Sequence, residues 1–371
     1  MEENSNAFDT KTAETNQSEI ICKGCSASLV YKPGTTNLKC EYCGAENEII
    51  VSNEEIKEIS FEKFLSEKYD SVDKVEVVTV KCQGCGAETT FDPNIISDSC
   101  AFCGSVIVVK TGTSQSIVKP GSLLPFQIDA KKAFLEFKNW INSLWWAPND
   151  LKKLASQSEK IKGMYIPYWT YDSKTSSSYT GQRGDNYTTT ETYRGSDGKT
   201  ATRTVTKIRW TYASGHIYHN FDDVLVLASN SLPRKYTERL EPWDLDKLIP
   251  YDEKFLSGFK TETYHIDMKD GFTDAKAKMD DAIRTMIKRD IGGDHQQISS
   301  VNTTYEDITF KHILLPIWIS AYRYSEKVYR FMVNARTGEV QGERPYSWIK
   351  ITLAILAGIG AIAAVVYFIN Q

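Results

Sequence analysis

The sequence predicts an α+β protein with two N-terminal zinc ribbons, a β-rich antiparallel middle region and one C-terminal transmembrane helix. Three observations lead to this fold class. All eight cysteines fall in CxxC pairs near the N-terminus, the middle of the chain is rich in Tyr, Thr and β-branched residues, and the last twenty residues are almost entirely apolar. With 371 residues, 41% hydrophobic and 25% charged, the chain suits two or three folded units of ordinary globular composition.

Residues 1–20 are predicted to be a disordered tail, because they are polar and acidic. They lack the basic start and the apolar run of a secretory signal. We therefore expect the chain to begin in the cytosol.

The cysteines predict one zinc ribbon at residues 21–50 and a second at residues 81–110. In each quartet fourteen residues separate the two CxxC pairs, and the second quartet repeats the first at an offset of 60 residues. A CxxC turn brings two thiolates within about 2.3 Å of one ion, and two such turns complete a tetrahedral site. The predicted ligands of two structural Zn²⁺ ions are Cys22, Cys25, Cys40, Cys43, Cys82, Cys85, Cys100 and Cys103.

Disulfides and redox-active pairs are the alternatives for these cysteines. Disulfides need an oxidising compartment, which the missing signal argues against. A redox CxxC opens a helix after a strand, whereas glycine and strand-like sequence follow these pairs. Four thiolates leave no open position on zinc, so a catalytic ion is not expected. Glycines in or just after the turns suit a knuckle that needs positive φ or close backbone approach: Gly24, Gly44, Gly84, Gly86 and Gly104.

Residues 51–80 form a charged linker between the two cysteine regions, with eight acidic residues and four lysines. Ile56, Ile59, Phe61 and Phe64 interrupt the charges and suggest a short helix or an adhesive linker. Neither the linker nor the predicted ribbons carry net positive charge.

Residues 111–345 are predicted to form an α+β region. A helix is expected from Asp129, which can cap it, to about Trp145. A second amphipathic helix is expected from Thr273 to Asp290. The apolar positions with helical spacing are Phe134, Phe137, Ile141 and Leu144 in the first, and Met279, Ile283, Met286 and Ile287 in the second.

Trp145 and Trp146 end the first of these helices. We expect both indoles in the core. The alternatives are contact with a partner or with the membrane surface.

The β-rich sequence begins at Met164. It predicts a strand, a bend and a second strand that ends near Gly184, followed by a hairpin of Tyr187–Tyr193 and Thr202–Tyr212. Ser and Thr alternate with apolar residues in this stretch, as in a half-solvated antiparallel sheet.

Two segments share an apolar-Pro-x-Trp core, at Tyr165–Trp169 and at Leu314–Trp318. Each precedes a strand pair, so we interpret them as a possible duplicated β unit, packed as a pseudo-symmetric pair. Asn334–Gly338 is predicted to form a hairpin turn, with Gly338 at positive φ. Whether 111–345 is one domain or two stays open.

Residues 349–369 are predicted to be a transmembrane helix. Nineteen residues from Ile351 to Ile369 carry no charge and span roughly 28 Å, close to the hydrocarbon thickness of a bilayer. A buried core helix is the alternative. Aromatic residues lie at both expected interfaces: Tyr346 and Trp348 before the span, and Tyr367 and Phe368 near its end.

The orientation follows from two observations. Arg344 and Lys350 precede the span, which favours a cytoplasmic N-terminal side, and reduced zinc thiolates need the same side. We expect a single-pass, tail-anchored protein whose N-terminal domains are cytoplasmic. Small residues three or four apart suggest possible homo- or hetero-oligomers through this helix: Ala354, Ala357, Gly358, Gly360, Ala361 and Ala364.

The sequence contains no recognised catalytic or cofactor-binding motif, and we expect a non-enzymatic protein. His216 and His219 lie three apart in a strand-like run, which points them to opposite faces and makes a poor chelate. The adjacent acidic pairs Asp222–Asp223 and Asp280–Asp281 are expected to be caps or solvated surface without partners.

Nucleic acid is an unlikely partner, because the net charge is −4 and an anchored protein is poorly placed to bind it. A mildly basic, Tyr- and Thr-rich face keeps a membrane-tethered nucleic-acid-binding protein as the alternative function. The basic residues concerned are Arg183, Arg194, Lys199, Arg203, Lys207 and Arg209.

The chain resembles one bacterial family. The resemblance rests on the CxxC ribbons, the terminal anchor and four segments between them: Tyr165–Asp172, Leu314–Trp318, the turn at Asn334–Val340, and Gly342–Ser347. The members of this family are tail-anchored zinc-ribbon membrane proteins, often labelled TFIIB-type zinc-ribbon or primosomal-helicase-like. One Bacillus member of the family that this chain resembles belongs to a membrane-stress module, together with PspA-like and SPFH/flotillin-like proteins. The resemblance implies an adaptor or scaffold that recruits cytosolic proteins to the bilayer in an envelope-stress response. A helicase activity does not carry over, because the chain has no Walker loop.

Overall fold

The computed structural model describes residues 20–66, 74–82, 86–91, 97–100, 102, 106–108, 113–151, 161–194, 200–325 and 327–369. Within them the architecture is α+β, with mainly antiparallel sheets and one apolar helix at the C-terminal end, as the sequence predicts.

A nine-stranded sheet forms the centre of the molecule. Its main order is β12-β11-β15-β10-β13, and β4, β14, β16 and β17 pair with these strands or with one another. The strands are β4 (Ile59–Ser60), β10 (Ser122–Leu123), β11 (Lys162–Arg194), β12 (Thr200–Leu227), β13 (Ile249–Pro250), β14 (Lys260–Thr261), β15 (His295–Tyr324), β16 (Lys327–Asn334) and β17 (Val340–Gly342).

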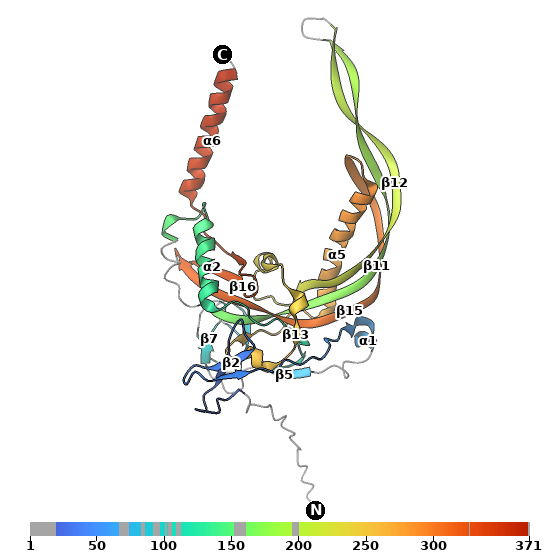
Figure 1. Ribbon diagram of the computed structural model, residues 1–371. Helices are drawn as coiled ribbons and strands as arrows, with labels where there is room; N and C mark the ends of the chain where they lie inside the picture. The colour runs from blue at the N-terminus through green and yellow to red at the C-terminus, as the bar shows by residue number, and fades with distance from the viewer. Residues whose placement is uncertain are drawn as a thin grey trace, which may run out of the picture.

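Strands β11 and β12 form a hairpin that extends far beyond the rest of the sheet (Figure 1). Residues 185–194 and 200–209 form a free two-stranded ribbon past the end of β15. The predicted hairpin of Tyr187–Tyr193 and Thr202–Tyr212 is confirmed, while its turn at 195–199 lies outside the described residues.

The expectation of a bend before Gly184 is wrong, because β11 runs unbroken for 33 residues. The register shifts at Asp172 and again between Thr180 and Gly181. Such bulges bend and twist a strand without ending it. A Cβ on Gly181 would lie 2.3 Å from the carbonyl oxygen of Gln297, so this glycine permits a close strand approach rather than a turn.

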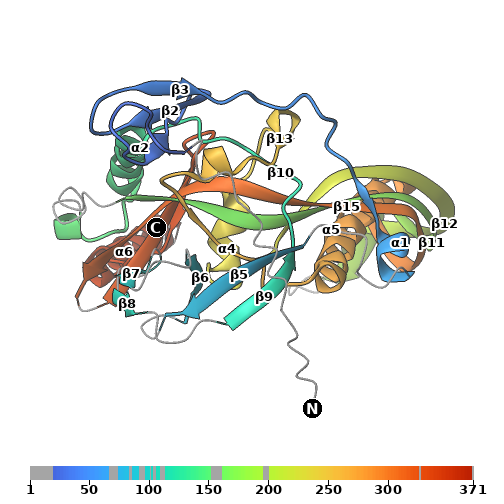
Figure 2. The ribbon, with the colours of Figure 1, turned by 90° about the horizontal axis from the view of Figure 1, so that it is seen from below.

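Three smaller sheets come from the cysteine-containing N-terminal part. In Figure 2, β2 and β3 lie on one side of β11 and β15, and β5 to β9 lie on the other. The small sheets are β1 (Leu29–Tyr31), β2 (Asn37–Cys40) and β3 (Glu46–Glu48); β5 (Lys74–Lys81), β6 (Glu88–Phe91) and β9 (Thr113–Val118); and β7 (Ser97–Ser99) with β8 (Val106–Val108).

Both predicted helices of the middle region are confirmed. Asp129 caps the first by accepting a hydrogen bond from the backbone N–H of Lys132, and the second begins five residues earlier than expected, after the cap Asp267. The α-helices are α1 (Phe61–Ser66), α2 (Ala130–Ser143), α4 (Arg234–Thr237), α5 (Met268–Ile291) and α6 (Trp348–Ile369), and the short 3₁₀ turns are η2 (Glu238–Leu240), η3 (Leu245–Lys247) and η4 (Glu253–Leu256).

The two apolar-Pro-x-Trp segments lie side by side on β11 and β15. Tyr165 pairs with Pro316, Ile166 with Leu315, and Pro167 with Leu314. The two motifs are therefore related by a local two-fold axis through the Ile166–Leu315 pair, as antiparallel pairing allows.

The same symmetry extends to the elements around the motifs. β10 pairs in parallel with β15, and β14 pairs in parallel with β11. Each short strand leads to an Ile-Asp pair and a helix, so that Ile128-Asp129 before α2 corresponds to Ile266-Asp267 before α5.

The two halves exchange their supporting contacts. The indole N–H of Trp169 donates to the carbonyl of Ile266 at 2.8 Å, and that of Trp318 donates to the carbonyl of Ile128 at 2.9 Å. Each tryptophan thus holds the start of the helix that belongs to the other half. Ala228 N–H bonds to Pro167 O and Ala335 N–H bonds to Pro316 O, both at 3.1 Å.

The central sheet is covered on both faces. Tyr165, Leu314 and Trp318 pack in one core with α2 and the first cysteine region. Their neighbours Met164 and Ile166 point to the opposite face, into a core that includes Cys82, Cys100 and Phe102. β4 and α1, within the charged stretch 51–80, also join the body, because Phe61 and Phe64 pack against Phe310.

Candidate metal centre

The first four cysteines meet at one point. The sulfur atoms of Cys22, Cys25, Cys40 and Cys43 all lie within 4.8 Å of one another. Cys22 Sγ is 3.5 Å from Cys43 Sγ, and Cys25 Sγ is 3.5 Å from Cys40 Sγ. A tetrahedral ion with bonds of about 2.3 Å would place its sulfur ligands about 3.8 Å apart. This all-thiolate set fits a tetrahedral metal ion such as Zn²⁺.

The local backbone explains why the thiols converge. In each knuckle, the N–H of the first cysteine donates to the carbonyl of an alanine five residues later, and its own carbonyl accepts from the residue four positions later. That fourth residue has positive φ, at Ser26 in the first knuckle and Gly44 in the second. The sequence expectation is therefore right for Gly44, whereas Ser26, not Gly24, takes the left-handed conformation in the first turn.

The knuckle that begins at Cys82 has the same geometry. Cys82 N–H donates to Ala87 O at 2.8 Å, Gly86 N–H donates to Cys82 O at 2.9 Å, and Gly86 has φ of 76°. Cys82 and Cys100 are buried. Cys85 and Cys103 lie outside the described residues, so the described part of the chain contains one complete four-cysteine group.

The four thiols of the first group do not titrate alike. Backbone N–H groups of Gly24 and Cys25 lower the pKa of Cys22, and the N–H of Cys43 lowers the pKa of Cys40 to about 6 against the effect of burial. An N–H from Ala27 lowers the pKa of Cys25, but the neighbouring thiols outweigh it and raise that pKa to about 12. Local backbone donors therefore favour the thiolate form of Cys22 and Cys40, which is the form that binds a metal ion.

The first four-cysteine region packs directly on the rest of the fold. Tyr31 N–H donates to Ser257 O at 3.0 Å, and the Tyr31 ring packs edge-on against Phe255 at 4.9 Å. The Tyr31 hydroxyl donates to Phe126 O at 3.2 Å, and Gly34 N–H donates to the same carbonyl at 2.8 Å.

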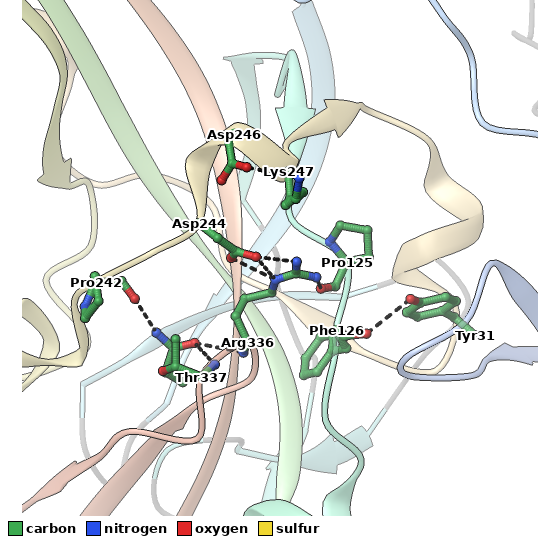
Figure 3. Close-up of polar contacts among 10 residues, drawn as sticks. Tyr31, Pro125, Phe126, Pro242, Asp244, Asp246, Lys247, Arg336 and Thr337 are labelled. Carbon is green, nitrogen blue, oxygen red and sulfur yellow. Dashed lines mark hydrogen bonds and ion pairs between the residues drawn. The ribbon is translucent and has the colours of Figure 1, made fainter.

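Arg336, from the predicted hairpin turn, stabilises the segment on which the first four-cysteine region packs (Figure 3). Its guanidinium donates to Pro125 O at 2.9 Å and forms a bidentate pair with Asp244, at 2.9 and 2.5 Å. The turn itself is confirmed, because Gly338 has φ of 86° and its N–H donates to Asn334 O. The metal region and the distal turn are thus connected through the segment around Phe126.

Three aspartates form another cluster of potential metal ligands, which the sequence did not indicate. Carboxylate oxygens of Asp172, Asp222 and Asp223 lie within 4.8 Å of one another. The Lys311 ammonium is 2.7 Å from Asp223 and 3.2 Å from Glu58, and is buried among these groups. A cation supplied by the chain already lies among these carboxylates, so the group is an ion-pair network rather than a metal site.

The expectation that the adjacent acidic pairs lack partners is therefore wrong. Asp223 pairs with Lys311, and Asp280 accepts a hydrogen bond from the Tyr305 hydroxyl at 2.7 Å. Strand β15 supplies both partners, and nothing in the local sequence of either pair could have indicated them.

Helix α6 is 22 residues long, and none of its residues is buried in the body. It is long and apolar enough to cross a membrane.

The core position expected for Trp145 and Trp146 is wrong, because they are 75% and 42% exposed. They lie in the turn after α2, and Trp146 O accepts a hydrogen bond from Ser347 N–H at 2.7 Å, just before α6.

The basic residues of the β11–β12 hairpin are largely paired. Arg203 and Lys207 both contact Glu191, at 3.3 and 2.8 Å, and Arg183 contacts Asp185. Lys199 lies outside the described residues. The β11–β12 hairpin therefore offers less unpaired positive charge than its sequence indicates.

Comparison with known proteins gives one distant relative. The chain is 24% identical over 328 residues to "Uncharacterized protein YdjG" of Bacillus subtilis (strain 168), a match that covers 74% of this chain and 92% of the relative. No protein-family model matches, and no solved structure matches.

Proposed function

We propose that this protein is a non-enzymatic, membrane-anchored adaptor whose zinc ribbons help to recruit cytosolic proteins to the bilayer. The observation that carries the proposal is a four-thiol site, seated on a rigid body, in a chain that ends in an exposed apolar helix. Four thiolates leave zinc no open position for a substrate, so the ion's role is to hold a surface in shape.

In this proposal two ions are bound, one by Cys22, Cys25, Cys40 and Cys43, and one by Cys82, Cys85, Cys100 and Cys103. The knuckle at Cys82 supports the second site, because it repeats the hydrogen bonds and the positive φ of the first. The helix α6 would span the membrane with the rest of the chain in the cytoplasm, and envelope stress is the setting that the family resemblance implies.

The first ribbon offers a surface on which a partner protein can bind. Tyr42, between the second pair of cysteines, is 85% exposed, and Ile50 at the end of the ribbon is equally open. An exposed aromatic ring on a rigid knuckle is a favourable contact for another protein, because little side-chain entropy is lost on binding.

The test is to extract the full-length protein from its native membranes in mild detergent and identify the proteins that co-purify. Samples with and without nuclease would be compared with Cys40→Ser, which removes a metal ligand, and with Tyr42→Ala, which leaves all four ligands. A defined set of proteins that survives nuclease and is lost with Cys40→Ser supports an adaptor. Loss of the same set with Tyr42→Ala, at unchanged zinc content, would assign the contact to this knuckle.

The second candidate is a membrane-tethered nucleic-acid-binding protein, favoured by the aromatic and basic residues of the β11–β12 hairpin. It predicts an affinity that falls steeply with salt and weakens in the double variant Arg203→Gln and Arg209→Gln. Binding that is absent or insensitive to salt would remove this candidate.

A further inference from the structure

The turn that follows α2 is tied to the first turn of α6. Lys350 Nζ lies 3.0 Å from Trp145 O, 2.8 Å from Ala147 O and 2.8 Å from Asn149 Oδ1. An ammonium group has three hydrogens, so these acceptors satisfy it completely. Ser347 N–H adds a fourth bond, to Trp146 O. The turn and the helix start are therefore held as one unit.

The body holds the other side of this turn. Leu144, Ala147 and Leu151 are buried in the core that contains α2 and the first ribbon. Because apolar residues on both sides of the tryptophan pair point inward, the two indoles are left pointing outward. Their exposure is thus imposed by packing and is not a property of a loose loop.

We propose that Trp145 and Trp146 sit in the headgroup region of the bilayer and form, with Trp348, a three-indole seat that fixes the body against the membrane. This inference rests on the proposed membrane anchoring by α6. Indole rings favour the membrane–water interface, since one end is apolar and the N–H needs a polar partner. Trp348, in the first turn of α6, is 74% exposed and belongs at that interface if α6 spans.

The charges beside the seat suit an anionic lipid surface. Lys350 lies 6.0 Å from the Trp145 ring centre, and Arg344 stacks on Tyr346 at 5.4 Å, so each cation is placed next to an exposed aromatic ring. Arg344 can bind lipid phosphates directly, whereas Lys350, whose hydrogens are all used within the protein, contributes only its positive charge.

The exposed aromatic residues of the β11–β12 hairpin do not share this setting. The hairpin projects on the same side of the body as α6 (Figure 1), but its outer ribbon carries Arg203, Lys207 and Arg209 and a free backbone edge. Such a strand pair is excluded from hydrocarbon, so the proposal requires the bilayer to meet α6 at a tilt that leaves the hairpin in water. Trp210, which is 40% exposed on this hairpin, therefore serves as the matched control.

The experiment uses full-length protein in phosphatidylcholine–phosphatidylglycerol vesicles, with some phosphatidylcholine brominated near the headgroup end of its acyl chains. Bromine quenches nearby indoles. Wild type, the double variant Trp145→Phe and Trp146→Phe, and the control Trp210→Phe are compared. Resistance to alkaline carbonate extraction reports separately whether α6 is inserted.

In the double variant, we expect the bromolipid-quenchable emission to fall to about one third, because only Trp348 of the three interfacial indoles remains. Trp210→Phe should lower the total emission but leave this component unchanged. The difference in emission between wild type and the inserted double variant comes from Trp145 and Trp146. If aqueous iodide quenches this difference and bromolipid does not, the two rings face water and the proposal is wrong. If carbonate extracts the wild type, the membrane anchoring itself fails, which is a distinguishable result.

A second comparison tests the tie to α6. Lys350→Met removes all three ammonium bonds, whereas Arg344→Met removes a nearby positive charge without touching the turn. We expect Lys350→Met, measured on inserted protein, to lower the bromolipid quenching and Arg344→Met to leave it near wild type. Wild-type quenching in Lys350→Met would refute the positioning role given to this lysine.

Discussion

Loss of the metal ion that we propose for the first four-cysteine group should destabilise the whole body, because Tyr31 and its neighbours belong to the same core as Leu314 and Trp318. The perturbation is Cys40→Ser, which replaces a buried thiol of the four-cysteine group. Structural zinc binding in small ribbons is worth about 10–16 kcal/mol at neutral pH, so an unliganded ribbon is not expected to stay folded on its seat.

The interface sets the size of the effect on the body. The Tyr31 ring is fully buried, and removing a buried aromatic ring typically costs about 3–5 kcal/mol. Hydrogen bonds also cross the interface, to Ser257 and to Phe126, and each contributes about 1 kcal/mol. We therefore expect the body to lose at least about 3 kcal/mol, a large share of an ordinary domain's stability.

The assay is hydrogen exchange of the full-length protein in detergent, together with zinc content and urea unfolding. Exchange in residues 314–322, beneath the ribbon, should accelerate in Cys40→Ser. Tyr31→Ala should accelerate the same segment while all four thiols remain, which separates the seat from the metal. Lys32→Gln is the control, because it breaks only a solvent-exposed ion pair with Glu46, and such pairs contribute little to stability. A Cys40→Ser protein that has lost one zinc but shows wild-type exchange at 314–322 would refute the coupling.

Three further predictions concern the body. Trp169→Phe and Trp318→Phe each remove one hydrogen bond to the opposite half and should each cost about 1–3 kcal/mol in urea unfolding, whereas Trp210→Phe should cost less than about 0.5 kcal/mol. Burial raises the pKa of Asp172 to about 6 from 3.8, so the folded protein binds this proton more tightly and stability should fall as pH rises between about 4 and 6. Asp172→Asn lacks this loss, so above pH 6 its free energy of unfolding should exceed that of wild type by at most about 3 kcal/mol, and near pH 4 the two should be equal. A difference that shrinks as pH rises would contradict the assignment. Arg336→Lys keeps the charge but not the bidentate fork to Asp244, and a loss of about 1–2 kcal/mol is expected by the same measurement.

The local features of the fold were predictable from the sequence because short-range chemistry determines them. Asp129 caps α2, and the turn before Gly338 forms as its residues indicate. The first four cysteines converge because each CxxC turn is defined by hydrogen bonds within six residues. These features depend on neighbours in the chain, so a single sequence contains what is needed to find them.

The features that were missed depend on distant partners. β11 continues through its bulges because β12 and β15 support it on both sides, although its own sequence indicates a bend. Asp223 gains its cation from Lys311, 88 residues away. The indoles of Trp145 and Trp146 turn outward because the buried residues around them are fixed by α2 and α6, which no local pattern reveals.

The exchange of contacts between the two halves explains how one sheet can support both the cysteine regions and α6. Trp169 holds the start of α5, and Trp318 holds the start of α2, so neither half has a complete helix seat of its own. One cysteine region packs on each face of the strands that carry these tryptophans. A partner that bound either cysteine region, as we propose, would therefore act on a shared core. The turn after α2 connects that core to α6 through Lys350. If α6 spans a membrane and the four-cysteine group holds an ion, as proposed, packing alone would link the orientation of the body to the integrity of the metal site.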